Sequence, residues 1–189
     1  MKKIVIRFNA PVILAFALLS LLALLLGKWT DGAATYQYFS VYRASLSDPL
    51  TYVRFFGHVL GHADYEHYMS NMLLILLVGP GLEEKYGSGT MVWTIAVTAL
   101  VTGLAHFVFF PGSVLLGASG VVFMMIVLSS FTAMRRGEIP ITLILVVIFY
   151  LGGEIMDGLF KQDSISQITH IVGGLCGLVF GFTIRRGRR

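Results

Sequence analysis

Leu116-Gly117-Ala118-Ser119-Gly120 and Thr169-His170-Ile171-Val172-Gly173-Gly174 each stand at the head of an apolar run. The first stretch places a serine between glycines, and the second places a histidine directly before glycines. Serine needs a base to become a nucleophile, and neutral imidazole is the usual one. Small residues on one helix face let helices approach closely. Together the two stretches predict a serine–histidine pair held between two packed helices.

Composition indicates a membrane protein. Of the 189 residues, 56% are apolar and 13% are charged, whereas about a quarter are charged in an average soluble domain. The formal net charge of +4 comes from basic residues at the chain ends and in short loops between apolar runs. This distribution is typical of membrane topology and excludes a nucleic-acid interface. The length suits one domain over residues 1–189, and the lone Cys176 excludes an intrachain disulfide.

Around the two motifs the sequence predicts an all-α membrane protein with six spanning helices. The expected spans are residues 10–27, 66–82, 90–110, 118–134, 139–158 and 165–184. Several approach the about 20 residues that a bilayer requires. We expect the second span to end at Gly79-Pro80-Gly81, because glycine and proline interrupt helices. The first run has the basic head of a signal peptide but no clear small-x-small cleavage site, so we expect it to be retained.

Residues 28–65 form a long first loop that is rich in aromatic side chains but has no spanning apolar run. Amphipathic aromatic residues favour the headgroup level of a bilayer. Two interpretations stay open: a loop lying partly in the interface, or a small solvated loop with its own core. Six spans put both termini on one side, and most of the 14 Lys and Arg residues share that side. This bias predicts cytoplasmic termini and an extracytoplasmic first loop.

On this topology Ser119 and His170 lie at similar depth, near the extracytoplasmic side. Ionisable groups inside a membrane are costly and point to a functional site. Phe123 follows Ser119 by four residues on the same helix face, where its ring could orient the imidazole. Gly173 and Gly177 share the face of His170 and allow the close approach that the pair requires.

A second cluster supplies hydrogen-bond donors. His67 and Asn71 stand four residues apart, hence on one helical face, and both can stabilise a tetrahedral oxyanion. The Gly117 loop backbone and the free N–H groups at the start of the fourth helix are further candidate donors. These residue types in this pattern indicate acyl-transfer chemistry at Ser119.

Other ionisable residues allow alternatives. His58, His62 and His67 could suggest zinc, but the HExxH pattern is missing and Asn71 would be left unexplained. We therefore expect no metal and no cofactor. His106 has no recognisable partner in the sequence and is interpreted as a packing histidine. Glu154 and Asp157 could orient His170, with solvation at the interface as the favoured alternative.

The motifs resemble those of the rhomboid intramembrane serine proteases. The matching stretches are His58-Val-Leu-Gly-His62-Ala-Asp-Tyr-Glu-His67-Tyr-Met-Ser-Asn71, Gly117-Ala-Ser119-Gly120 and His170-Ile-Val-Gly173-Gly-Leu-Cys-Gly177. They occur in the family's order, and the resemblance runs from about Arg54 to Gly181. Together, on the expected helices, they are specific to this family.

The resemblance implies a six-helix rhomboid-like bundle, a Ser119–His170 dyad without a required acid, and an oxyanion site that includes His67 and Asn71. Phe123 stands where bacterial members often have a tyrosine. The implied activity is that of a serine endopeptidase, with transmembrane proteins as substrates and the lipid bilayer as surroundings. We expect no nucleic-acid partner and leave the oligomeric state open. A bacterial-type plasma membrane is the expected location.

Two other functions are considered. A catalytically inactive relative that binds membrane helices would not need Ser119 and His170 together. A small transporter would need a continuous polar path, whereas the polar groups here gather at one depth. Within the protease interpretation, we expect the fifth span and the loop at 158–166 to move and admit substrate.

Overall fold

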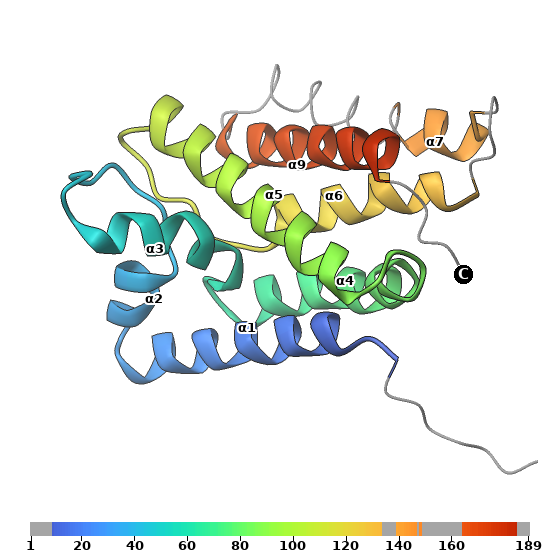
Figure 1. Ribbon diagram of the computed structural model, residues 1–189. Coiled ribbons are helices and arrows are strands. Elements are labelled where there is room, and N and C mark those ends of the chain that lie inside the picture. The colour runs from blue at the N-terminus through green and yellow to red at the C-terminus, as the bar shows by residue number, and fades with distance from the viewer. Residues whose placement is uncertain (1–8, 134–138, 147, 149–163, 185–189) are drawn as a thin grey trace, which may run out of the picture.

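The computed structural model describes residues 9–133, 139–146, 148 and 164–184 (Figure 1). This part of the chain is helical and contains no β-strand beyond an isolated bridge between Val41 and Leu115. In chain order the elements are α1 Pro11–Trp29, α2 Ala33–Tyr38, α3 Pro49–Gly57, the 3-10 helix η1 His58–Leu60, α4 Tyr65–Tyr86, α5 Ser88–Phe109, α6 Ser119–Ser130, the 3-10 helix η2 Phe131–Ala133, α7 Ile141–Val146 and α9 Ser164–Thr183. Glu154, Asp157 and most of the 158–166 loop lie outside the described residues, as does much of the expected 139–158 span.

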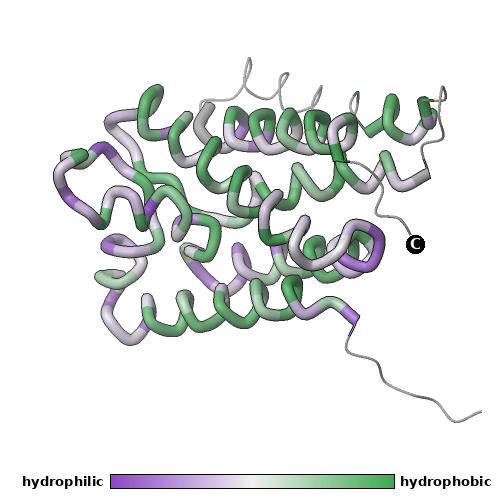
Figure 2. Tube along the Cα trace, viewed as in Figure 1, coloured by the Kyte–Doolittle hydropathy of each residue, from purple (hydrophilic) through white to green (hydrophobic). Residues whose placement is uncertain are grey.

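Two of the described helices, α1 and α5, are long and apolar enough to cross a membrane. Shorter apolar helices cover α6 and the Gln167–Thr183 part of α9. Figure 2 shows hydrophobic residues along most of α1, and exposed leucines such as Leu18 and Leu22 on α1 can face lipid. The helical fold agrees with the expected class, while the count of six spans stays a prediction.

The central helix of the bundle is α6. It contacts α4, α5, α7 and α9, and its apolar side chains are buried on nearly every side. A helix that is hydrophobic all round requires such an enclosed position. Ser119 is therefore carried on the best-packed element of the fold.

The prediction that the second span ends at Gly79-Pro80-Gly81 is wrong, because α4 continues through Pro80 to Tyr86. Contacts with α1 stabilise this continuation. Gly79 is buried against the Ile13 side chain, which would have to shift to admit a Cβ atom. The buried Glu83 carboxylate accepts hydrogen bonds from the backbone N–H groups of Val12 and Ile13, both at 3.0 Å. Tertiary packing thus outweighs the helix-breaking tendency of proline.

The long loop contains three short helical segments, α2, α3 and η1, which the sequence did not reveal. Its centre is Arg54, which is 4% exposed. The Arg54 guanidinium donates to the Gln37 carbonyl oxygen at 2.9 Å, pairs with Asp48 at 3.1 Å, and lies over the Tyr42 ring. Phe55 is buried, but several other aromatic side chains of this region are exposed, among them Trp29 at 78%, Tyr36 and Tyr52. The loop therefore combines a core of its own with an exposed aromatic surface suited to a membrane interface.

Candidate active site

The backbones of α6 and α9 touch along a line of glycines. Gly173 lies against the Gly120 backbone, and Gly177 lies against the Met124 carbonyl oxygen. A Cβ atom at either glycine would collide with the facing backbone. Because both contacts advance in the same direction along the two helices, α6 and α9 run parallel. This register puts the start of α6 beside the His170 turn of α9.

Ser119 is the first residue of α6 and is partly exposed, although its neighbours Ala118 and Gly120 are buried. Ala118 occupies the N-cap position and has no side chain that can cap. The first backbone hydrogen bond of the helix runs from Val122 N–H to the Ala118 carbonyl oxygen, at 2.9 Å. The earlier N–H groups have no acceptor within their own helix.

His170 is partly buried and its ring is held by Phe123. The two rings stack with centroids 4.3 Å apart and planes 5° from parallel. Phe123 lies one turn after Ser119 on the same helix, so the stack places the imidazole against the first turns of α6. The structure therefore brings His170 and Phe123 together, and the pairing of His170 with Ser119 stays a prediction.

Gly117 makes the turn that leads into α6. Its φ of +126° is a conformation that favours glycine. A Cβ atom there would lie only 2.8 Å from Cε1 and Nε2 of His67, so the glycine also lets that imidazole approach the loop. The Gly117 N–H group donates to the His58 carbonyl oxygen at 2.9 Å. This hydrogen bond makes Gly117 an unsuitable oxyanion donor, and the α6 N–H groups are the remaining backbone candidates.

His67 and Asn71 project from the first two turns of α4. The His67 N–H group donates to the Asp64 carboxylate at 2.8 Å, which caps the helix. The buried Asn71 amide donates to the His67 carbonyl oxygen at 2.9 Å. An amide nitrogen carries two hydrogens, so one is left for another acceptor. The structure therefore brings His67 against Gly117, in the connection 110–118 that leads into Ser119 (the Ser119 loop). Asn71 lies one helical turn further along α4.

His58 and His62 are both 1% exposed and lie in the segment before α4. Burial lowers the pKa of each imidazole to about 4, so both rings are neutral near pH 7. Nδ1 of His58 lies 3.2 Å from the Arg54 carbonyl oxygen and Nε2 lies 3.3 Å from the Thr102 hydroxyl. In residues 9–133, 139–146, 148 and 164–184, no three His, Cys, Asp or Glu side chains converge as metal ligands would. His106 packs against Phe110 and lies 3.2 Å from the Ser113 carbonyl oxygen.

A family model described as the Rhomboid domain matches residues 49–187, which include every residue of this site. The chain belongs to the rhomboid family. It is 31% identical over 144 residues to Rhomboid-related protein 1 of Caenorhabditis elegans, covering 69% of this chain and 39% of that relative. It is 29% identical over 164 residues to Rhomboid-related protein 2 of Mus musculus, covering 74% of this chain and 53% of that relative. The rhomboid chain thus spans about half or less of the length of these relatives.

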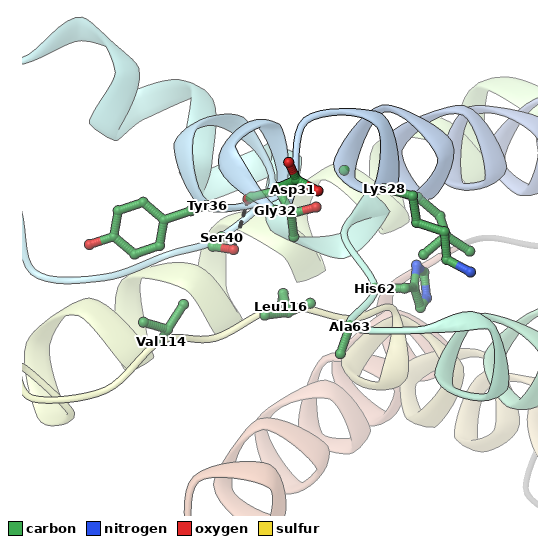
Figure 3. Close-up of a pocket in the computed structure, with 12 residues that line it drawn as sticks. Lys28, Asp31, Gly32, Tyr36, Ser40, His62, Ala63, Val114 and Leu116 are labelled. Carbon is green, nitrogen blue, oxygen red and sulfur yellow. Dashed lines mark hydrogen bonds between the residues drawn. The ribbon is translucent and has the colours of Figure 1, made fainter.

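The rhomboid chain has a cavity of about 300 Å³ beside Leu116, and most of its lining precedes the matched residues 49–187 (Figure 3). The ends of α1 and α2 form one side, and Ala63, Val114 and Leu116 line the other. His62 also lines it, and its Nδ1 lies 3.1 Å from the Leu60 carbonyl oxygen, so the proton is on Nδ1. Within the described residues, the buried Nε2 of His62 has no hydrogen-bond partner and is therefore an open acceptor.

His62 is the site residue that the sequence analysis left without a role. Its ring meets that of His67 edge to face, with centroids 5.0 Å apart. The sequence signal was the four-residue interval between His58 and His62. It does not reveal that the His62 ring packs against His67, or that the His58 carbonyl oxygen accepts the Gly117 N–H.

Proposed function

We propose that the chain is an intramembrane serine endopeptidase that hydrolyses peptide bonds in or near transmembrane helices of membrane-protein substrates. The parallel contact of α6 with α9 carries this proposal: Gly120, next to Ser119, packs against Thr169 and Gly173, and His170 stacks on Phe123. Family membership supports the same activity. No cofactor takes part in the proposed reaction.

In the proposed reaction the Ser119 hydroxyl attacks the scissile carbonyl carbon while His170 takes its proton. The tetrahedral oxyanion receives hydrogen bonds from the N–H groups at the start of α6 and from the His67 and Asn71 side chains. As the peptide bond breaks, His170 passes the proton to the leaving amine. Water then attacks the acyl-enzyme with His170 again as base, and the released serine recovers its proton.

The choice of substrate should depend on how easily a transmembrane helix exposes its backbone to Ser119. A transmembrane helix satisfies its own backbone hydrogen bonds, so the substrate must unwind before Ser119 can reach a carbonyl. Helices with small or helix-weakening residues near the cut should be favoured. The cavity next to Leu116 is positioned to receive a side chain of the unwound segment.

The proposed setting is a bacterial-type plasma membrane, with both termini cytoplasmic and the site near the extracytoplasmic side. The biased distribution of Lys and Arg supports this orientation. The substrate entrance is proposed at the fifth span and the 158–166 loop. Unchanged activity after that span is cross-linked to α4 would contradict this entrance.

Cleavage of a single-span reporter protein in liposomes tests the proposed activity. The parent should cut the reporter, whereas Ser119→Ala and His170→Ala should each reduce the rate by a factor of at least about 1000. Both variants must keep the thermal unfolding temperature of the parent. Persistent cleavage by Ser119→Ala would contradict the mechanism.

A further inference from the structure

A second, apolar groove lies between α1 and α5, away from the Ser119 loop. Its volume is about 340 Å³, and every residue that lines it is apolar. The floor is buried and includes Phe16, Ile95 and Ala99, whereas Leu19 and Val92 on the rims are about half exposed. The 3-10 helix η1 contacts both helices, and its Val59 and Leu60 also line the groove, as does Phe56 of α3.

The groove has the dimensions of a lipid tail within one leaflet. Its lining runs from Val12 to Leu19 on α1 and from Val92 to Ala99 on α5. At 1.5 Å per residue each range is about 10 Å long, which fits within the ~15 Å hydrocarbon depth of one leaflet. Both ranges start near the N-terminal ends of their helices, so the groove opens to the leaflet at that end of the bundle.

The surroundings of the groove decide its occupant. The rims belong to α1 and α5, the two helices in the described part of the chain that are long and apolar enough to span a membrane, so in a bilayer the mouth would face hydrocarbon. An empty groove would leave its lining without dispersion partners. A polar ligand would find no charged side chain in the lining. We propose that a phospholipid acyl chain occupies this groove, packs against Val59 and Leu60, and so stabilises the position of η1.

The occupied groove would act on the Ser119 loop through a short path. His58 begins η1, directly before Val59, which lines the groove, and the His58 carbonyl oxygen accepts the Gly117 N–H at 2.9 Å. Gly117 in turn sets the turn into Ser119. Loss of the acyl chain removes the support of η1 and loosens this turn. The effect on activity rests on the proposed protease function, whereas the lipid site does not.

A phosphatidylcholine that carries a photoreactive group on its acyl chain tests the site directly. The Ser119→Ala chain, in nanodiscs, is irradiated at increasing probe fractions, and labelled residues are identified by mass spectrometry. Labelling at 92–99 should saturate while labelling at the exposed Leu73 and Leu77 of α4 still rises. Ala96→Phe, which fills the groove, should reduce the groove label at least about fivefold. Leu18→Phe, at a lipid-facing position outside the lining, should leave it unchanged.

Ala15→Phe fills the groove from the α1 wall and replaces Ala96→Phe should that variant fail to fold. Even, non-saturable labelling of all exposed helices would overturn the lipid site. Cross-links between two chains at these residues in place of lipid labelling would also overturn it and identify an interface between copies.

Reporter cleavage in detergent tests whether the bound acyl chain affects activity at Ser119. Removal of bound lipid should slow the parent at least about fivefold, and phospholipids with different headgroups should restore the rate equally. Ala96→Phe should keep its rate without lipid. Saturable labelling together with a lipid-independent rate would overturn the coupling. Saturable labelling of a chain that never cleaves would instead contradict the proposed protease function and leave the lipid site standing.

Discussion

The two sides of the candidate site are built in opposite ways. On the serine–histidine side, α6 and α9 meet through bare glycine backbone, with Gly173 against Gly120. On the donor side, the segment from His58 to Asn71 is held by buried neutral imidazoles and by hydrogen bonds to backbone groups. The first side should therefore be sensitive to added volume, and the second to added charge or to the loss of a polar partner.

Of the substitutions that distinguish the two sides, Gly173→Val should slow cleavage most, because its Cβ would collide with the Gly120 backbone. We expect cleavage to fall by a factor of at least about 100 and the chain to lose ~1–3 kcal/mol of stability. Reporter cleavage and thermal unfolding measure the two effects. Gly81→Ala is the matched control, since no described atom lies within 4 Å of a Cβ there. An active Gly173→Val would show that the helices do not need this contact.

Acid should weaken the donor side. The unfolded chain binds a proton at His62 near pH 6.5, but the buried ring resists protonation until about pH 4. Stability should therefore fall as the pH drops through this window, by ~3 kcal/mol for one such ring. His62→Asn should flatten the dependence of the unfolding temperature on pH between these values. Equal slopes for parent and variant would contradict the neutral buried ring.

Removal of the α4 cap should have a smaller effect on the same side. Asp64→Ala takes away the acceptor of the His67 N–H group. We expect ~1 kcal/mol loss of stability and a slower rate, because His67 loses its fixed position. The exposed Glu66→Ala, in the same first turn, is the control. A rate and unfolding temperature equal to those of Glu66→Ala would show that the cap does not position His67.

Phe123→Tyr should have the smallest effect, since it keeps the ring stacked on His170. We expect the reporter cleavage rate to stay within about threefold of the parent, whereas Phe123→Ala should lose about tenfold because the imidazole is no longer oriented. Similar rates for the alanine and tyrosine variants would show that the stacking does not position the base.

Much of the site could be predicted from residue spacing. The intervals from Ser119 to Phe123 and from His170 to Gly173 and Gly177 place side chains on helix faces, and those faces meet in the structure. Such intervals are local: once a helix forms, they decide which residues share a face, independently of contacts with distant segments.

Features that depend on distant segments could not be read in this way. The continuation of α4 through Pro80 requires α1, whose N–H groups bind Glu83. The hydrogen bond from the Gly117 N–H to the His58 carbonyl oxygen forms only because the connection before α6 lies against the segment before α4. The α2 and α3 helices are short, and Arg54 connects them by a hydrogen bond to the Gln37 carbonyl oxygen and an ion pair with Asp48. The hydrophobic periodicity of the sequence does not predict such contacts.

Labelling with a serine-directed fluorophosphonate probe tests the Ser119–His170 pair most directly, because it needs no knowledge of the substrate. The purified parent should be labelled once, at Ser119, as mapped by peptide mass spectrometry. His170→Ala should lose the label while Gly81→Ala keeps it. Labelling at another residue, or equal labelling of the parent and His170→Ala, would contradict the proposed pair.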